Sequence, residues 1–357
     1  MRFVRILPTD MAEMVDWRFM HLFDVGEQLQ LRLETQRNPV ADEVAAITAV
    51  VRPILAGTLF TLRNDLVERV GGLAAITLDL LSRLYRQGDG DCGICFEYAV
   101  HDAVQRREPS VLERIHEALT VHCRLPGDDL ASILFAVEKT GTERLVDTNR
   151  GLLTDDSVLM YGTRGRPVKL SKHLTGLGAA FRRPGARPNL PQSISGLWKA
   201  DLFLGTSDED RWVGTSVKIN PRHLEAGRGL RVGIVPNRQG RADIIRREGN
   251  LVVCPLPHDA SFMEVFYQGW GVIQHLIRAD FRMPREVDLP RPPERQVARY
   301  LVDRRRFPVL DVIDALEPLA QPELLETVER NADLVVAREG EQETRSVVAP
   351  VPRLDMG

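Results

Sequence analysis

The chain has 357 residues, a formal net charge of −3 and an apolar content of 43%, the values of an ordinary globular protein. No run approaches the roughly 20 apolar residues that a membrane-spanning helix requires, and the first residues lack the apolar core and cleavage site of a signal peptide. The four cysteines are too few for a disulfide scaffold. We therefore expect a cytoplasmic protein with no membrane partner.

Residues 1–88 are expected to form a helical N-terminal region. Apolar residues recur at helical spacing over residues 11–37, 41–70 and 73–85, with Pro53 as a kink or break in the second helix. No residue pattern in this region points to chemistry. We expect it to serve packing, homodimer formation or the binding of partner proteins.

Residues 89–285 are expected to form an α/β (α+β) core, a mixed central sheet flanked by helices. Helices are predicted at 92–107 and at 110–122, the second with Ser110 and Glu113 as a capping box. Residues 128–138 fit a helix or a strand. Strands are predicted at 197–204, 212–219, 230–236 and 251–255, and a further helix at 261–279.

Residues 286–357 are expected to contain C-terminal helices followed by an acidic tail. The helices are predicted at 294–305 and 309–315. Acidic residues outnumber basic ones after Glu317, and residues 333–357 are expected to be poorly ordered.

The core is interrupted by a basic insertion at about residues 146–191, rich in Gly, Pro and Arg, with a hairpin expected at 157–172 around Gly165. No Asp or Glu occurs from Ser157 to Ala200. This asymmetry favours a local site for a polyanion over a merely solvated basic face. The basic residues from which we expect contacts to a nucleic-acid backbone are Arg164, Arg166, Lys169, Lys172, Arg182 and Arg183.

Two charged residues interrupt neighbouring apolar strands directly after this insertion. Asp201 lies within Trp-Lys-Ala-Asp-Leu-Phe-Leu-Gly, and Lys218 lies within Trp-Val-Gly-Thr-Ser-Val-Lys-Ile-Asn. A buried charge is costly unless it is paired or bound to metal. An Asp and a Lys on adjacent strands of a hairpin form either an edge-strand salt bridge on a half-solvated face or a catalytic pair.

This order of elements resembles the PD-(D/E)XK, or restriction-endonuclease-like, nuclease superfamily. That family has an Asp on one strand, an acid-x-Lys motif on the next, and in many members a Glu from the first core helix. Asp201, Lys218 and Glu97 match these positions, whereas Ser216 occupies the place of the motif's acid. The resemblance covers roughly residues 91–279.

The resemblance implies a metal-dependent endonuclease that acts on DNA, in bacterial defence or repair. Glu97 and Asp201 would hold Mg²⁺ or Mn²⁺, Lys218 would orient or activate the attacking water, and Ser216 would be a weak ligand. Asn220 and Arg222 would contact a phosphate directly after the second strand.

Several alternatives remain open on sequence alone. Ser216 also fits a nuclease-like fold that has lost catalysis and acts as a DNA-binding or scaffold subunit. A third interpretation is a helical interaction protein whose basic region contacts an acidic partner. Cys92 and Cys95 could belong to a zinc site but suit core packing better. His258, at the end of a strand, stands either beside a site or at the start of the next helix.

Overall fold

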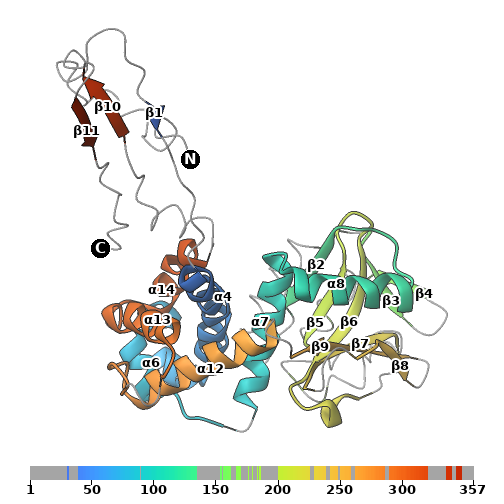
Figure 1. Cartoon of the computed structure of the whole chain (residues 1–357). Coiled ribbons are helices and arrows are strands. Elements are labelled where there is room, and N and C mark those ends of the chain that lie inside the picture. Colours follow the sequence, from blue (N-terminus) through green and yellow to red (C-terminus); the bar gives the residue numbers. More distant parts are fainter. Residues whose placement is uncertain are drawn as a thin grey trace. The chain divides into compact units, whose positions relative to one another are not determined.

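The structure of the chain, a computed structural model, divides into two compact units, Met1–Ala46 with Ala315–Gly357, and Ile47–Asp314. It describes residues 30–31, 39–88, 90–134, 153–154, 156–161, 166–169, 200–225, 229–238, 242–247, 250–258, 262–285, 289–320, 335–339 and 343–347, and the single residues 176, 179, 183 and 185. The second unit combines residues 47–88 of the expected N-terminal region with the expected core and the first residues after it (Figure 1).

The first unit contains a small antiparallel sheet. Its strands are β1 (Gln30–Leu31), β10 (Val335–Glu339) and β11 (Glu343–Val347), in the order β1-β10-β11. The helix predicted over residues 11–37 is wrong at β1, and the remainder of that range lies outside the described residues. Residues 333–357 were expected to lack order, and β10 and β11 correct that expectation for ten of them.

The N-terminal helices of the second unit differ from the expected ones in where they end. Helix α4 (Pro39–Phe60) continues through Pro53, where a kink or break was predicted. Val51, Ile54 and Leu55 beside this proline are fully buried, so packing outweighs the hydrogen bond that proline removes. The chain then forms α5 (Asn64–Arg69), η1 (Leu73–Ala75) and α6 (Leu78–Leu84).

Helices from the end of the core pack against these N-terminal helices. They are α12 (Phe262–Arg278), α13 (Pro292–Asp303) and α14 (Val309–Ala315), and their predicted positions are confirmed. The short helix η7 (Pro318–Ala320), which was not predicted, follows in the chain. A Cβ at Gly269 of α12 would lie 2.7 Å from a methyl of Val50 in α4. The absence of a side chain there therefore lets these two helices approach closely.

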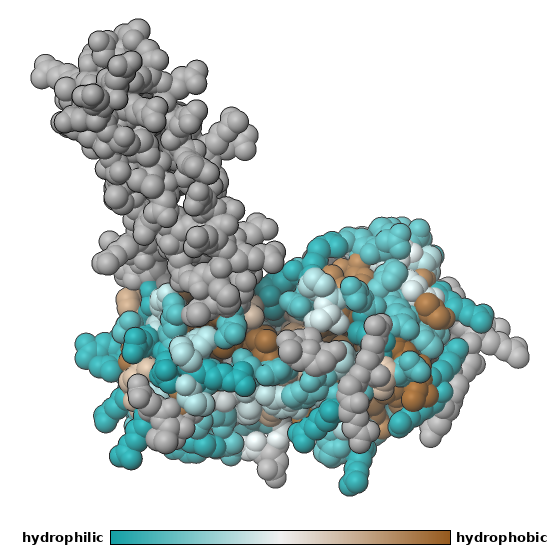
Figure 2. Space-filling view, in the orientation of Figure 1, coloured by the Kyte–Doolittle hydropathy of each residue, from teal (hydrophilic) through white to brown (hydrophobic). Residues whose placement is uncertain are grey.

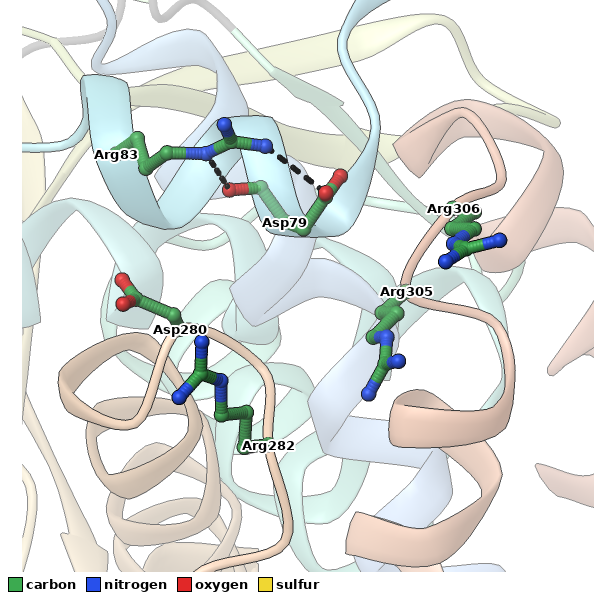
Figure 3. A pocket seen from close by; sticks show the side chains of 6 residues that line it. All are labelled: Asp79, Arg83, Asp280, Arg282, Arg305 and Arg306. Carbon is green, nitrogen blue, oxygen red and sulfur yellow. Dashed lines mark hydrogen bonds and ion pairs between the residues drawn. The ribbon is translucent and has the colours of Figure 1, made fainter.

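A charged pocket lies where α6 and the segments that follow α12 and α13 meet. Its volume is about 320 Å³, and Figure 3 shows the six side chains that line it, Asp79, Arg83, Asp280, Arg282, Arg305 and Arg306.

The expected helices at the start of the core are present as α7 (Asp91–Gln105), α8 (Pro109–Glu117) and the π-helical turn η2 (Ala118–His122). The predicted capping box at Ser110 and Glu113 is wrong. Glu108 is the N-cap residue, Pro109 occupies the first turn, and the Ser110 hydroxyl donates to the Glu108 carboxylate at 3.1 Å. Proline suits this position because its missing N–H would have no helical partner there.

The larger sheet is mixed, as the sequence predicted. It contains β2 (Leu130–Leu134), β5 (Leu202–Thr206), β6 (Arg211–Val217), β7 (Arg231–Asn237), β9 (Leu251–Pro257) and β8 (Ile245–Arg247), in that spatial order. Strands β2, β5 and β6 pair antiparallel, β6, β7 and β9 pair parallel, and β8 is antiparallel to β9. The ambiguous segment 128–138 therefore contributes a strand.

Helices α7 and α8 join the sheet through buried polar contacts. In α7, His101 Nδ1 lies 3.0 Å from the Ser132 hydroxyl in β2. In α8, the buried Arg114 donates to the carbonyl of Pro255 in β9 at 3.3 Å. These contacts fix α7 beside the antiparallel strands and α8 beside β9.

The visible face in Figure 2 is mostly hydrophilic, with apolar residues in smaller areas between the charged ones. The window Glu43–Phe60 in α4 is long and apolar enough by composition to cross a membrane, yet 72% of it is buried inside the protein. That degree of burial is the pattern of a core helix.

Candidate functional site

The residues predicted from the two strands and the first core helix meet at one ammonium group. Lys218 Nζ lies 2.6 Å from Asp201 Oδ2 and 3.1 Å from Glu97 Oε1. The exposed fractions of the side chains are 29% for Lys218, 17% for Asp201 and 13% for Glu97. The three residues, which we call the Lys218 centre, come from α7, from the residue before β5 and from the residue after β6. The three side chains are half-buried, but the alternative of an edge-strand salt bridge is wrong, because β5 and β6 each have a neighbouring strand on both sides.

Backbone hydrogen bonds at the strand ends position Asp201, in addition to its ion pair with Lys218. The Asp201 amide donates to the Thr215 carbonyl at 2.8 Å, so Asp201 extends the pairing of β5 with β6. Its carboxylate oxygen Oδ2 accepts the amide of Val217 at 2.8 Å, in addition to Lys218. The Lys218 amide donates to the Ile234 carbonyl of β7 at 2.9 Å. Both charged residues are therefore fixed through their backbones.

The electrostatics of the Lys218 centre favour a charged lysine. Burial alone would lower the pKa of Lys218, but the carboxylates of Asp201 and Glu97 outweigh it and raise that pKa above its usual value. At neutral pH Lys218 is therefore an ammonium that donates hydrogen bonds. In this arrangement it can stabilise negative charge but cannot accept a proton.

An arginine that sequence reasoning missed lies near the same carboxylate. Arg231 begins β7 and is only 4% exposed; burial lowers its pKa, and the charge of Asp201 opposes that effect. Asp201 thus acts on two cations from two neighbouring strands. In the sequence Arg231 stands directly before an apolar run. A charged residue at that place usually marks a strand end exposed to solvent, so the pattern did not indicate a buried arginine.

Ser216 is 3% exposed and pairs in register with Gly233 of β7. A Cβ at Gly233 would lie 2.9 Å from both terminal methyls of Leu224. The position beside Ser216 is therefore filled by apolar side-chain atoms. A larger ligand at residue 216 would have to displace them.

The two carboxylates of the Lys218 centre can share one cation, because both contact the same ammonium. Carboxylate oxygens are the ligands that Mg²⁺ and Mn²⁺ prefer. Within the described part of the chain no group of three or more His, Cys, Asp or Glu side chains is placed to hold a metal. Glu97 and Asp201 supply two carboxylates, and both are engaged by the Lys218 ammonium, so a metal ion at this place stays a prediction.

The parallel strands place further polar residues at one edge of the sheet. Lys218, Arg238 and His258 follow the carboxyl ends of β6, β7 and β9, the edge at which open α/β sheets bind ligands. The His258 ring stacks on Tyr267 of α12 with 5.3 Å between the ring centroids. His258 therefore packs against the helix at this edge, and residues 259–261, which link it to that helix, lie outside the described residues.

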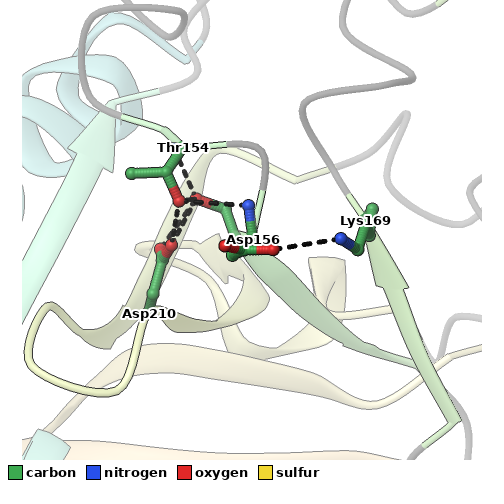
Figure 4. Close-up of polar contacts among 5 residues, drawn as sticks. Thr154, Asp156, Lys169 and Asp210 are labelled. Carbon is green, nitrogen blue, oxygen red and sulfur yellow. Dashed lines mark hydrogen bonds and ion pairs between the residues drawn. The ribbon is translucent and has the colours of Figure 1, made fainter.

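The basic insertion is described only in part. Strands β3 (Val158–Tyr161) and β4 (Arg166–Lys169) form the predicted hairpin, and β3 also pairs with β6. Lys169 is exposed and binds Asp156 at 3.1 Å (Figure 4). Arg183 is exposed, Arg166 lies in β4, and Arg164, Lys172 and Arg182 lie outside the described residues.

A carboxylate anchors this insertion to the hairpin that holds Asp201. Asp210, in the turn between β5 and β6, accepts hydrogen bonds of 2.7 Å from the hydroxyls of Thr154 and Ser157 (Figure 4) and from the indole of Trp212. The basic hairpin β3–β4 is thereby tied to β6, although the Lys218 centre lies beyond the opposite end of that strand.

The two phosphate contacts expected after β6 are exposed. Asn220 is the N-cap of η6 (Pro221–His223), and its side-chain oxygen accepts the Arg222 amide at 3.0 Å. The cap occupies the side-chain oxygen of Asn220, and Arg222 lies in the turn four residues after Lys218. Contact of either residue with a phosphate stays a prediction.

Cys92 and Cys95 lie in α7 as thiols, half-buried and buried respectively. Cys95 Sγ lies 3.5 Å from the carbonyl of Ile54, and burial raises the pKa of Cys92 to about 11. Thiols that contact buried backbone in this way fit the core interpretation, and the described residues place no group of three His, Cys, Asp or Glu side chains around them.

Comparison of the chain with protein-family models, curated proteins and solved structures finds no match.

Proposed function

We propose that this chain is a metal-dependent endonuclease that hydrolyses phosphodiester bonds in DNA, built on a restriction-endonuclease-like core. The observation that carries the proposal is the contact of Lys218 Nζ with both Asp201 and Glu97. These residue types come from the strand, strand and helix on which the resembled family places its Asp, Lys and Glu. A chance surface pair would not require a third charge from a helix more than one hundred residues away.

The order of elements supports the core assignment. Helix α7 precedes the antiparallel strands β2, β5 and β6, and β5 and β6 form the hairpin that bears Asp201 and Lys218. Strand β7 then pairs parallel to β6, and α12 follows the sheet. Between β6 and β7 the described residues contain only the short turn η6, where a longer helix would match the family more fully.

The chain's own residues account for the chemistry that hydrolysis needs. Lys218, held as an ammonium, would stabilise the charge on the phosphoryl oxygens. Arg222 would bind a neighbouring phosphate, and Glu97 and Asp201 would hold the metal ion. When bound there, Mg²⁺ would supply positive charge against the same oxygens and acidify water.

Cleavage of plasmid, linear double-stranded and single-stranded DNA in Mg²⁺ or Mn²⁺ tests the proposal. Asp201→Asn and Glu97→Gln should each lower the cleavage rate by about 100-fold or more, because each removes a carboxylate that would hold the metal. The matched control is Asp65→Asn in α5, which removes an exposed carboxylate paired with Arg63 at 2.8 Å. Wild-type rates in both Asp201→Asn and Glu97→Gln would refute the proposal.

A second candidate function is a catalytically silent nuclease-like subunit that binds DNA or serves as a scaffold. The observations in its favour are Ser216 in the place of an acid and Lys218 neutralising both carboxylates. It predicts salt-dependent DNA binding that Asp201→Asn leaves unchanged, with no cleavage in either metal. Ser216→Asp, a smaller insertion than Glu beside Leu224, should then tighten Mn²⁺ binding without weakening DNA binding.

A further inference from the structure

The pocket between the helices gathers charged side chains from three segments that are distant in sequence. Asp79 and Arg83 come from α6, Asp280 and Arg282 follow α12, and Arg305 and Arg306 follow α13 (Figure 3). Pockets for drug-like ligands are lined mainly by apolar and aromatic side chains. The six residues here are all charged, so the pocket suits a small, strongly polar ligand.

The carboxylates of the pocket do not balance its guanidinium groups. Asp79 is engaged by Arg83 at 2.9 Å and by the Thr77 hydroxyl at 2.5 Å. Asp280 is approached by the Ser82 hydroxyl at 3.5 Å. Among the described residues, the side chains of Arg282, Arg305 and Arg306 make no hydrogen bond or ion pair. The described lining of the pocket thus carries three cations without a partner and one remaining carboxylate, an excess of positive charge that would attract an anion with several oxygens.

The backbone fixes these segments against one another. The Asp79 amide donates to the Arg305 carbonyl at 2.9 Å, and the Leu78 amide donates to the Phe307 carbonyl at 3.3 Å. The backbone frame that bears the arginines therefore exists before any ligand binds, which lowers the ordering cost of binding.

The loop after α12 is held in a conformation that favours glycine. Asp280 and Phe281 have φ values of 50° and 51°, and the Asp280 and Phe281 amides close the helix end by donating to Ile277 and Leu276 at 3.2 and 2.7 Å. The fully buried Phe281 ring anchors this turn. Asp280 therefore adopts a backbone conformation that glycine adopts most easily. In this conformation its side chain lines the pocket.

We propose that this pocket binds a phosphate group through Arg282, Arg305 and Arg306. Guanidinium groups match phosphate oxygens with paired hydrogen bonds, and these three line one pocket from two segments of the chain. Asp280 limits the affinity by its own charge. The pocket uses none of Glu97, Asp201 and Lys218, so a phosphate can bind there whether or not the chain cleaves DNA.

Titration calorimetry of the full chain with pyrophosphate tests the proposal. Arg305→Gln should weaken binding by about tenfold or more, since it removes a charge-assisted contact. Asp280→Asn should strengthen binding by about threefold, since it removes the repelling charge. The matched control is Arg304→Gln, the adjacent arginine, whose guanidinium binds the Tyr300 carbonyl at 3.1 Å and does not line the pocket.

Thermal melting of each variant shows that it folds. Absence of pyrophosphate binding by the wild-type chain would overturn the proposal, as would equal weakening in Arg304→Gln and Arg305→Gln. Competition then separates the two sources of the phosphate. Displacement of pyrophosphate by a single-stranded oligonucleotide, lost in Arg305→Gln, identifies a nucleic-acid backbone, and displacement only by nucleoside monophosphates identifies a free phosphorylated compound.

Discussion

At the Lys218 centre one ammonium contacts the carboxylates of Glu97 and Asp201. The contribution of each charge to stability therefore depends on the other two. If the ammonium were removed, Glu97 and Asp201 would face each other at 13% and 17% exposure without the charge that they now share. Breaking a partly buried ion pair leaves such a charge uncompensated, which costs more than the pair contributes when intact. The stability of the unit should therefore depend on all three residues together.

Lys218→Gln should lower the free energy of unfolding by about 2 kcal/mol at pH 7, measured by urea denaturation. Adding Glu97→Gln to that variant should restore part of the loss, because the repulsion between two carboxylates disappears. The raised pKa of Lys218 sets the pH range: its stabilisation is complete below the ordinary lysine value of 10.5 and is lost as the pH rises through the higher folded value. A double variant less stable than Lys218→Gln alone would contradict this coupling.

The sequence allowed these three residues to be found because charges interrupted apolar runs. Asp201 and Lys218 could be paired through the hairpin, and Glu97 through the resemblance. Arg231 could not be found in this way, since its burial depends on the parallel pairing of β7 with β6 and β9. The charged pocket escaped notice for a related reason: Asp79, Asp280 and Arg305 are separated by long stretches of chain, and only the packing of helices brings them together.

At the scale of elements, the contact between α7 and β2 carries a titratable group. His101 is enclosed between the helix and the strand with Nδ1 3.0 Å from the Ser132 hydroxyl, and burial lowers its pKa to about 4. The folded chain thus holds this imidazole neutral over a range in which the unfolded chain protonates it. We therefore expect the packing of α7 against β2 to become less stable in acid.

The free energy of unfolding should fall as the pH decreases from 6.5 toward about 4, because the unfolded state binds an extra proton over that interval. His101→Gln keeps a polar partner for Ser132 and should flatten this part of the profile. Denaturation at several pH values measures the slope, with His116→Gln, a half-exposed histidine on α8, as the control. An unchanged slope in His101→Gln would exclude His101 as the cause.

Most elements followed from periodicity, and the exceptions have physical explanations. The strands β5, β6, β7 and β9 are apolar runs of the expected length, and α12 has an apolar stripe. Strand β8 escaped prediction because Ile245, Arg246 and Arg247 are all exposed and form only an edge. The break predicted at Pro53 is wrong because the packing of the buried residues around it outweighs the low helix propensity of proline.

For the whole molecule, the proposed function depends on how charge is distributed. The basic residues precede and follow β6, whereas the acidic ones dominate after Glu317. The described part of the basic region offers Lys169, Arg183 and Arg222 as exposed cations. DNA binding, if it uses them, must show the salt dependence that phosphate contacts impose.

Arg222→Gln should reduce the slope of log K against log salt concentration for DNA binding by about 0.9, since one phosphate contact is lost. Fluorescence anisotropy with a labelled duplex at four salt concentrations measures the slope. Arg63→Gln is the control, because Arg63 already pairs with Asp65 at 2.8 Å. Equal slopes for Arg222→Gln and the wild-type chain would remove Arg222 from the interface.

Asp201 accepts a backbone amide and a lysine ammonium on the same carboxylate oxygen. The same oxygen atom therefore contributes both to the alignment of the strand end and to the contact with the Lys218 ammonium. Asp201→Asn would weaken both contacts at once, because the amide and the ammonium share this oxygen. The alignment of the two strand ends and the position of the Lys218 ammonium therefore depend on one atom, and a substitution meant to remove a charge also loosens the end of a hairpin.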